Sequence, residues 1–191
     1  MKWKIRYFDI FFYSILIIFV VTLGIILFPA FEKNVYYPLK YSEYVEKYCN
    51  EYEVEKTLCY SMMKSESGFN KNVVSNSGAI GLMQITLPTG VFIAEKLGET
   101  VSESDLKNPE TNIKYGLYYV NYLQKKFPGK YEMLAAYNAG EGRVTEWLKD
   151  SSYSENGNYL IITPYKETNN YIERPLKYYY KYKNYYKELD K

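Results

Sequence analysis

The feature that most constrains this chain is an apolar stretch close to its N-terminus. Residues 10–28 contain no charged side chain and only four residues that are not strongly apolar. A helix of about 20 such residues is long enough to span the hydrocarbon core of a bilayer. We therefore expect a transmembrane helix over residues 10–28, which leaves the remainder of the chain to form any globular domain.

The charges in front of this stretch predict its orientation. Three cations precede it, against the single anion Asp9. The cations are Lys2, Lys4 and Arg6. Because an excess of cations marks the cytoplasmic side of a membrane helix, residues 1–9 are expected to form a cytoplasmic tail. A cleaved signal peptide is the alternative, but Phe28-Pro29-Ala30 matches the small-x-small cleavage pattern poorly.

The composition removes several kinds of catalytic chemistry. The chain has no histidine and only two cysteines, which excludes a Ser-His-Asp triad, a Cys-His pair and a His-rich zinc site. Its net charge of +2 comes from the N-terminal cations, since residues 29–191 carry equal numbers of cations and anions. A nucleic-acid partner is therefore not expected, and carboxylate chemistry is what remains.

The two cysteines, Cys49 and Cys59, lie on the extracytoplasmic side in the predicted orientation. A disulfide is chemically permitted there. Spacing along the chain does not show whether the two Cβ atoms face each other. A disulfide and a pair of buried thiols therefore both stay open.

Helical patterns dominate after residues 29–38, which we interpret as a short stalk, so residues 39–191 are predicted to form one mainly α domain. Asn108-Pro109-Glu110 has the cap, the proline and the early acid of a helix start. The best strand signal is residues 159–162, after a turn-like Asn-Gly-Asn. Helices are expected over 41–48, 58–66, 113–124 and 131–137, and another from about Pro88.

Glu66 is the candidate catalytic residue. It continues the apolar stripe of Leu58 and Met62 at helical spacing, so its carboxyl should face the apolar side. Burial favours the protonated carboxyl, and the carbonyl end of a helix acts in the same direction. A raised pKa is what a general acid requires. For Glu66 taken alone, an ordinary solvated glutamate near a helix end is the alternative.

Glu66 opens the first of four polar clusters, and each of the others also has an ordinary structural explanation. Gly81-Leu82-Met83-Gln84 is typical of a tight turn entering a helix, in which Met83 would only pack. Ala136-Tyr137-Asn138-Ala139-Gly140 is typical of a helix end with a buried tyrosine and an asparagine cap. The first and last clusters are Glu66-Ser67-Gly68-Phe69-Asn70 and Tyr165-Lys166-Glu167-Thr168.

In this order the clusters resemble the catalytic domain of the lytic transglycosylases, goose-type lysozyme-like enzymes that cut the glycan strands of bacterial peptidoglycan. The resemblance covers about residues 39–182, with framing residues such as Asn112-Ile113 and Gly116. It implies a lysozyme-like helical fold with at most a minor β element and no metal or organic cofactor. It also implies that Glu66 protonates the leaving oxygen of the MurNAc–GlcNAc β-1,4 bond. Glu66 would then act as base while the 6-hydroxyl of the same muramyl residue attacks C1, which gives a 1,6-anhydro end.

The resemblance also implies roles for the remaining candidate site residues. Tyr137 is expected near the acid and Asn138 on an N-acetyl group, while Glu167 and Tyr171 line the floor of the cleft. Small residues before the second cluster would let backbone approach a sugar closely, and Gln84 can donate and accept hydrogen bonds at once. The other expected substrate contacts are Ser67, Ser75, Gly81, Met83 and Gln84.

Two positions depart from the family pattern. Asn169 stands where arginine is frequent, and Pro175 stands where a branched apolar residue usually continues the helix. Proline in a helix interior costs about 3 kcal/mol, so we expect a kink or a later helix start there. The tyrosine- and lysine-rich residues 178–187 are expected to form a helix with one tyrosine face on the core, although stacking on sugars or at a membrane interface is an alternative.

Most glycosidases use a second carboxylate, but residues 67–94 contain no Asp or Glu. Glu141 or Glu167 could still fold into range, so a hydrolytic muramidase on the same fold stays open, as does a non-catalytic peptidoglycan-binding module. A purely structural membrane protein would leave the four clusters unexplained. We therefore expect a single-pass protein of the bacterial plasma membrane whose partners are peptidoglycan strands and, through residues 10–28, the membrane itself.

Overall fold

The structure is a computed structural model that describes residues 7–127 and 129–191. Lys2, Lys4 and Arg6, on which the predicted orientation depends, lie outside the described residues. Internal contacts divide the chain into two compact units, Met1–Pro38 and Leu39–Lys191. Each unit is described by itself.

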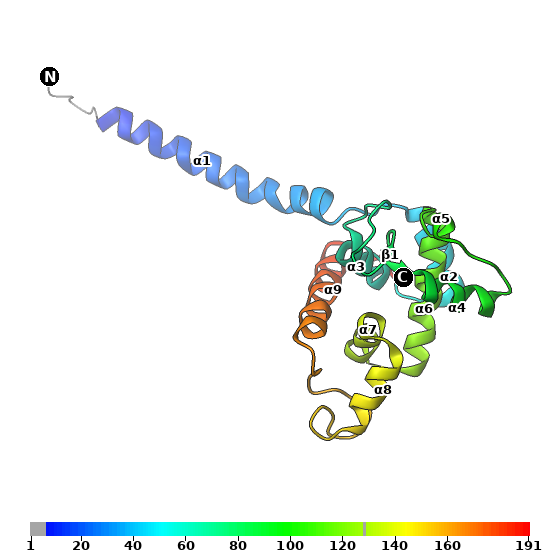
Figure 1. The fold of residues 1–191 in the computed structure, drawn as a ribbon. Coiled ribbons are helices and arrows are strands. Elements are labelled where there is room, and N and C mark those ends of the chain that lie inside the picture. Colours follow the sequence, from blue (N-terminus) through cyan, green and yellow to red (C-terminus); the bar gives the residue numbers. More distant parts are fainter. Residues whose placement is uncertain (1–6, 128) are drawn as a thin grey trace. The chain divides into compact units, whose positions relative to one another are not determined.

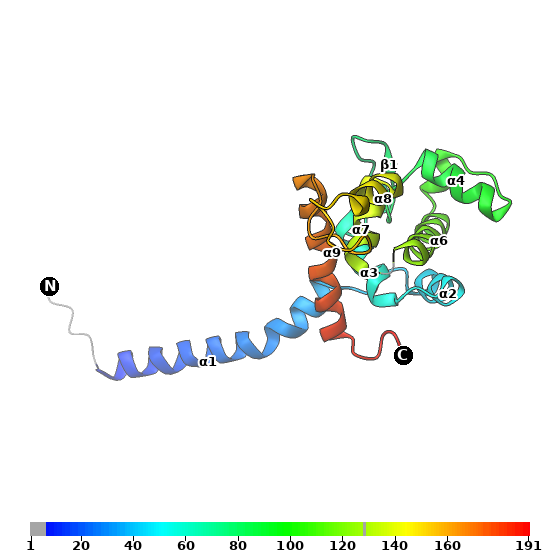
Figure 2. The ribbon, with the colours of Figure 1, turned by 90° about the horizontal axis from the view of Figure 1, so that it is seen from below.

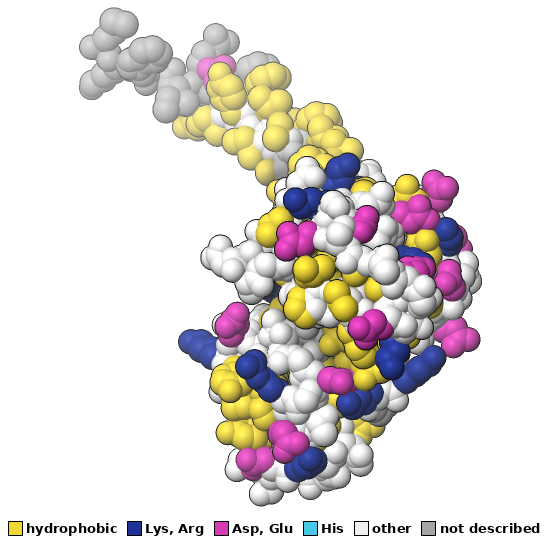
Figure 3. Space-filling view, turned by 45° about the vertical axis from the view of Figure 1, so that its right-hand side comes forward, with side chains coloured by type: hydrophobic (Ala, Val, Ile, Leu, Met, Phe, Trp, Pro, Cys, Tyr) yellow, Lys and Arg dark blue, Asp and Glu magenta, His cyan; other side chains and the backbone are white. Residues whose placement is uncertain are grey.

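The N-terminal unit is helical along most of its length. α1 runs over Tyr7–Phe31, through Pro29, and a π-helical turn, η1, follows over Glu32–Tyr36. The stretch Asp9–Tyr36, in which an 18-residue window reaches a mean hydropathy of 2.9, is long and apolar enough to cross a membrane, although a signal sequence would meet the same test. Figure 3 shows its surface as almost continuously hydrophobic, whereas the surface of the second unit mixes both signs of charge with scattered apolar side chains. Most of the predicted stalk is thus helical.

The second unit is mainly α, as predicted, with one very small sheet (Figures 1 and 2). Two-residue strands β1 and β2 pair antiparallel, with Ala79 opposite Thr86 and Ile80 opposite Ile85. The helices are α2 (Ser42–Tyr52), α3 (Lys56–Ser67), α4 (Leu87–Leu97), α5 (Glu103–Leu106), α6 (Pro109–Lys126), α7 (Lys130–Ala139), α8 (Glu141–Lys149) and α9 (Lys166–Tyr185). The strands are β1 (Ala79–Ile80) and β2 (Ile85–Thr86).

Local chemistry explains where the helices near the site begin and end. α6 starts as the sequence predicts, because the Asn108 carboxamide accepts hydrogen bonds from the backbone N–H groups of Glu110 and Thr111 at 2.9 and 3.2 Å. α4 begins at Leu87, where the Thr86 hydroxyl caps it. α3 ends at Gly68, whose φ of +58° is one that glycine adopts freely.

The core lies where α3 packs along α9, α2 packs on α6, and α7 contacts α6, α8 and α9. These contacts bury long apolar side chains on every helix involved, among them Leu58, Met62, Leu117, Leu134 and Ile172. The consequence for function is direct, because α3 carries the predicted catalytic glutamate at its C-terminal end and α9 lies beside it.

The strand predicted over residues 159–162 is wrong. Among the described residues, this stretch makes only an isolated bridge, between Ser154 and Leu160. β-branched and aromatic side chains favour a strand only where they can pack against a partner, and Tyr159, Ile161 and Ile162 are exposed with no neighbouring strand. The stretch belongs instead to an irregular segment between α8 and α9.

The proline in α9 does not delay the helix. α9 begins at Lys166, well before Pro175, so the later start that Pro175 suggested is wrong. Pro175 is buried, and the helix around it is held by packing along α3. In the tyrosine-rich part of α9, Tyr179 and Tyr182 are buried while Tyr180 is 68% exposed, which agrees with one tyrosine face on the core.

Cys49 and Cys59 are free thiols in the structure, and both are buried. The Cys59 thiol forms a side-chain hydrogen bond with Cys49, and burial raises its pKa. Of the two alternatives that the sequence leaves open, the structure therefore has the pair of buried thiols.

Candidate active site

Glu66 lies in the last turn of α3 and is partly exposed in a small pocket. The Tyr171 hydroxyl, on the first half of α9, donates a hydrogen bond to Oε1 of Glu66. The two residues are 105 positions apart in the chain. Packing of α3 along α9 is what brings them together.

Burial dominates the electrostatics of this carboxyl group. It raises the pKa of Glu66 from 4.5 to about 7, against the lowering effects of the Tyr171 hydrogen bond and of the positive charge of Arg174. Burial and the Glu66 charge together also raise the pKa of the Tyr171 hydroxyl. Glu66 is therefore protonated in a substantial fraction of molecules near neutral pH, as a general acid must be.

The hairpin of β1 and β2 forms another wall of the pocket, and a buried asparagine shapes its turn. The Asn112 carboxamide donates to the carbonyls of Ile80 at 2.9 Å and Leu106 at 2.8 Å, and it accepts from the N–H of Met83 at 2.7 Å. Gly81, with φ +79°, lies so close that an added Cβ would be 2.5 Å from the Asn112 side chain. The turn therefore requires both Gly81 and Asn112.

Gly116 on α6 provides the other close approach to this turn. An added Cβ there would lie 2.6 Å from the Cβ of Met83. The glycine therefore leaves room for the Met83 side chain, which is fully buried in the core. Side-chain packing is thus the role of Met83, although its backbone carbonyl accepts a hydrogen bond from the Tyr137 hydroxyl at 2.7 Å. That bond joins the hairpin turn to the end of α7.

The hairpin also holds the polar side chains that face the pocket. Gln84 has a φ of +51° and donates from Nε2 to the Gly81 carbonyl at 2.9 Å. The Ser75 and Ser77 hydroxyls lie 2.9 Å apart, and Ser75 also accepts from the N–H of Ala79 at 3.0 Å. These hydrogen bonds fix the orientation of the side chains before any ligand arrives.

Asn138 follows Tyr137 at the end of α7 and is exposed. Within the described residues no hydrogen bond occupies its carboxamide, which leaves both ends of the group available to a ligand. The pocket that it borders has a volume of about 210 Å³. Its lining is Glu66, Ser75, Ser77, Ala79, Gln84, Thr86, Tyr137, Asn138 and Tyr171.

The structure brings six of the predicted site residues into this one pocket and leaves four outside it. Ser67 donates to the Leu82 carbonyl at 2.9 Å and so anchors the hairpin turn. Gly81 shapes the same turn, and Met83 is in the core. The fourth, Glu167, lies in a neighbouring pocket.

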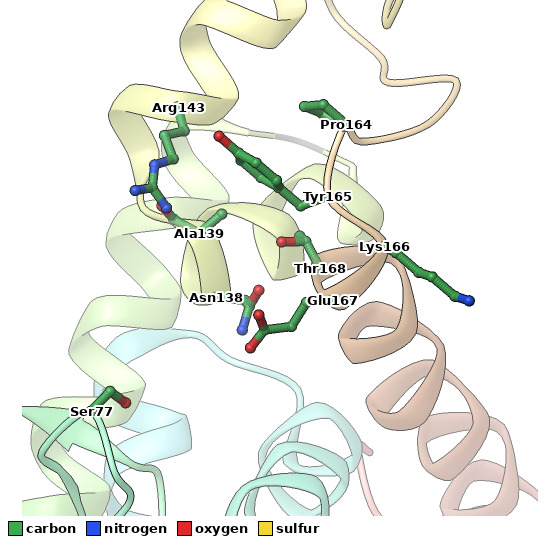
Figure 4. Close-up of a pocket in the computed structure, with 9 residues that line it drawn as sticks. All are labelled: Ser77, Asn138, Ala139, Arg143, Pro164, Tyr165, Lys166, Glu167 and Thr168. Atoms are coloured by element: carbon green, nitrogen blue, oxygen red, sulfur yellow. The ribbon is translucent and has the colours of Figure 1, made fainter.

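The neighbouring pocket has a volume of about 630 Å³ and shares Ser77 and Asn138 with the first. Figure 4 shows the Glu167 carboxylate beside the Asn138 amide, and Arg143 close to the Tyr165 ring, while the Lys166 side chain points away. The Arg143 guanidinium lies 5.8 Å from the centre of that ring. Together the two pockets form one polar, mostly open groove past Glu66.

Glu66 is the only carboxylic acid among the residues that line its pocket. Glu141 lies outside both pockets of the groove, paired with Lys126 at 3.0 Å. Glu167 borders only the neighbouring pocket. The pocket around Glu66 thus supplies one acid, a hydroxyl donor in Tyr171 and a free amide in Asn138.

Three residues that line the Glu66 pocket were not among the predicted site residues: Ser77, Ala79 and Thr86. Ser77 belongs to the same small polar run as Ser75, which was the available signal. Thr86 lies two residues after Gln84, at the end of β2, and its position close to this cluster was the available signal. The charge of Arg174 lowers the pKa of Glu66. The only sequence signal for this effect was the position of Arg174 one helical turn after Tyr171.

Comparison with known proteins agrees with this fold. Residues 43–160, which are more than half of the chain, match the Transglycosylase SLT domain family. The chain therefore belongs to the SLT transglycosylase domain family, as its motifs predicted. Tyr171 and the rest of α9 lie beyond the matched residues.

The relatives are named as lytic transglycosylases. The soluble lytic murein transglycosylase of Escherichia coli K12 is 33% identical over 152 residues, which are 76% of this chain and 24% of that protein. Membrane-bound lytic murein transglycosylase C of Edwardsiella ictaluri is 36% identical over 116 residues, 55% of this chain and 32% of that protein. This chain thus spans about a quarter to a third of the length of these relatives.

Solved structures show the same fold. The 70 kDa soluble lytic transglycosylase of Escherichia coli has a TM-score of 0.71 at 29% identity, with 81% of this chain and 26% of that chain covered. An inactive Glu-to-Gln mutant of the lytic transglycosylase Slt from Pseudomonas aeruginosa has a TM-score of 0.69 at 26% identity, with 80% and 25% covered.

Proposed function

We propose that this protein is a membrane-anchored lytic transglycosylase that cleaves the MurNAc–GlcNAc β-1,4 bond of peptidoglycan and leaves a 1,6-anhydro-MurNAc end. Membership of the SLT transglycosylase family supports the reaction class. The observation that carries the mechanism is a single partly buried acid, Glu66, whose pKa is raised to about 7 in a pocket lined by no other carboxylate.

Glu66 serves twice in this mechanism. As an acid it gives its proton to the glycosidic oxygen while the bond from that oxygen to C1 of the muramyl residue breaks. As a carboxylate it then takes the proton of the 6-hydroxyl while O6 bonds to C1. The proton on Glu66 is restored and no water is consumed.

The surrounding groups suit this cycle. Tyr171 donates to Oε1 of Glu66, which favours Oε2 as the oxygen that carries the proton. The same hydrogen bond stabilises the carboxylate that forms midway. Asn138 offers a free amide to an N-acetyl group beside the scissile bond, and Ser75, Ser77 and Gln84 offer polar contacts on the hairpin side.

The apolar N-terminal helix supports an anchor in the plasma membrane. In the orientation that the sequence predicts, residues 1–9 are cytoplasmic and the domain lies on the extracytoplasmic side, where peptidoglycan is found. The membrane-bound name of the Edwardsiella ictaluri relative agrees with membrane association.

The experiment is mass spectrometry of muropeptides released from purified peptidoglycan by the full chain in detergent micelles. Glu66→Gln is the test variant and Glu173→Gln, an exposed residue of α9, is the control. We expect products lighter by one water than reducing-end species, about 10²- to 10⁴-fold fewer with Glu66→Gln and unchanged with the control.

Two outcomes would contradict the proposal. Reducing-end products that depend on Glu66 would indicate a hydrolytic muramidase. Co-sedimentation with peptidoglycan without release of any product would indicate a binding module.

A further inference from the structure

The segment between α8 and α9 forms one wall of the larger pocket, although it has no regular secondary structure. It spans residues 150–165, and loops of this length without secondary structure are uncommon in compact domains and are often functional. Its last residues, Pro164 and Tyr165, line the pocket, as does Glu167 in the first turn of α9. Something must hold this segment in place for the pocket to keep its shape.

One side chain of α9 holds the end of the segment through both ends of its amide. Oδ1 of Asn169 accepts from the backbone N–H of Thr163 at 3.1 Å, and Nδ2 donates to the Thr163 carbonyl at 2.9 Å. Oδ1 also accepts from the Tyr131 hydroxyl of α7 at 3.0 Å. Asn169 thus joins the segment to α7 and α9 at a single point, and Thr163 is buried there.

The Thr163 hydroxyl strengthens this point. It lies 2.9 Å from Oδ1 of Asn169 and 3.1 Å from the Tyr165 carbonyl, so its one proton can serve either acceptor. The backbone N–H of Asn169 donates to the same Tyr165 carbonyl at 3.1 Å. The Tyr165 carbonyl therefore has the Asn169 N–H as a donor and the Thr163 hydroxyl within hydrogen-bond distance. The ring of Tyr165 also has contacts that hold it in place.

The Tyr165 ring is placed between two side chains of α8. It packs edge-on against Trp147, with ring centres 5.6 Å apart, and the Arg143 guanidinium lies over it. Trp147 is itself largely buried in the domain. A shift of the Thr163–Tyr165 backbone would withdraw this ring from the groove.

Only an amide of this length satisfies the arrangement. Aspartate has no donor for the Thr163 carbonyl and would place a charge against it, alanine has neither group, and arginine has no acceptor for the Thr163 N–H.

We propose that Asn169 is a positioning residue for glycan binding, which locks the Thr163–Tyr165 backbone and so fixes Tyr165 and Glu167 along the groove beside Glu66. This inference rests on the proposed function for the identity of the ligand, a peptidoglycan strand. It concerns binding and not the proton transfers, because Asn169 contacts neither Glu66 nor Tyr171 in the structure.

Hydrogen exchange tests the lock itself, independently of any activity. The full chain in detergent micelles is compared with Asn169→Asp and with Asn170→Asp, which adds the same charge one residue further on the exposed side of α9. We expect the backbone amides of residues 161–163 and 165 to exchange about tenfold faster in Asn169→Asp only. Unchanged exchange in Asn169→Asp would overturn the proposal.

Steady-state kinetics on peptidoglycan test what the lock does. For Asn169→Asp we expect KM to rise about fivefold while kcat and the midpoint of its pH profile stay as in the wild type. A purely structural role would instead lower kcat with KM unchanged, because fewer molecules would be folded. That result would overturn the positioning role, as would unchanged values of both constants.

Binding separates this proposal from the proposed function. If neither the wild type nor Asn170→Asp turns over peptidoglycan, the proposed activity fails, and co-sedimentation with peptidoglycan then decides the inference. About fivefold weaker binding by Asn169→Asp alone would support the positioning role. Equal binding by all three proteins would refute it.

Discussion

The two walls of the groove are built by different means. The wall formed by the end of α3 and the hairpin is held by the core, through the buried carboxamide of Asn112 and close approaches at Gly81 and Gly116. The opposite wall, the segment between α8 and α9, exposes Tyr159, Ile161 and Ile162 and is held at a few side-chain hydrogen bonds. The comparison shows that the wall with Glu66 depends on the packed core of the fold. The opposite wall can change while that core stays the same.

The largest expected effect is on the core-built wall. Asn112→Ala should lower the free energy of unfolding by about 3 kcal/mol, because the N–H of Met83 and the carbonyls of Ile80 and Leu106 lose their buried partner. Urea unfolding followed by circular dichroism measures it. Asn121→Ala on the same helix, which loses one hydrogen bond to the Tyr52 carbonyl, should cost clearly less, and equal costs would contradict the comparison.

The second effect concerns Glu66 and depends on pH. The unfolded carboxyl loses its proton near pH 4.5 and the folded one near 7, so this group makes folding progressively less favourable between these values. Glu66→Gln does not titrate there. It should therefore stabilise the protein by ~3 kcal/mol more at pH 8 than at pH 4.

Urea unfolding of Glu66→Gln and the wild type at the two pH values measures this difference. Glu173→Gln, exposed on α9, is the control and should give the same small change at both. A difference of the opposite sign for Glu66→Gln would mean that the folded protein favours the ionised carboxyl.

The third effect is on the opposite wall. The buried carboxylate of Glu132 on α7 accepts from the backbone N–H of Leu160 at 2.8 Å. Glu132→Ala should cost only ~1 kcal/mol of global stability, yet speed hydrogen exchange in residues 159–165. Glu146→Ala, exposed on α8, should do neither. Global unfolding as severe as in Asn112→Ala would show that both walls depend on the core alike.

The smallest effect is on the pH dependence of activity. Tyr171→Phe removes a hydrogen bond that lowers the pKa of Glu66, so the pKa rises and the alkaline limb of the rate profile moves to higher pH. The profile of kcat/KM on peptidoglycan measures its midpoint, whatever the rate at the optimum. Tyr180→Phe, exposed on the same helix, should leave the midpoint unchanged, and a shift of Tyr171→Phe to lower pH would contradict the assignment.

The sequence predicted most of the helices because caps, proline and apolar spacing act locally, as at Asn108-Pro109. It did not predict α5 or α8. It predicted a strand at residues 159–162 from β-propensity and a preceding turn-like Asn-Gly-Asn, and the part of the chain that the structure describes holds no neighbouring strand there for it to pair with. It also treated Met83 and Gly81 as candidate ligand contacts, whereas both serve the hairpin turn. These differences arise because propensity describes a residue, while pairing and burial depend on its neighbours in space.

What the sequence by itself determined is the list of chemical groups: an apolar helix, a glutamate at a helix end, and no histidine. Composition and local rules such as helical spacing give each of these features without knowledge of the rest of the fold. What only the tertiary structure decided is their effect on one another. Packing of α3 along α9 puts Tyr171 on Glu66 and removes water from the carboxyl, and this desolvation, which depends on residues distant in the chain, raises its pKa to about 7.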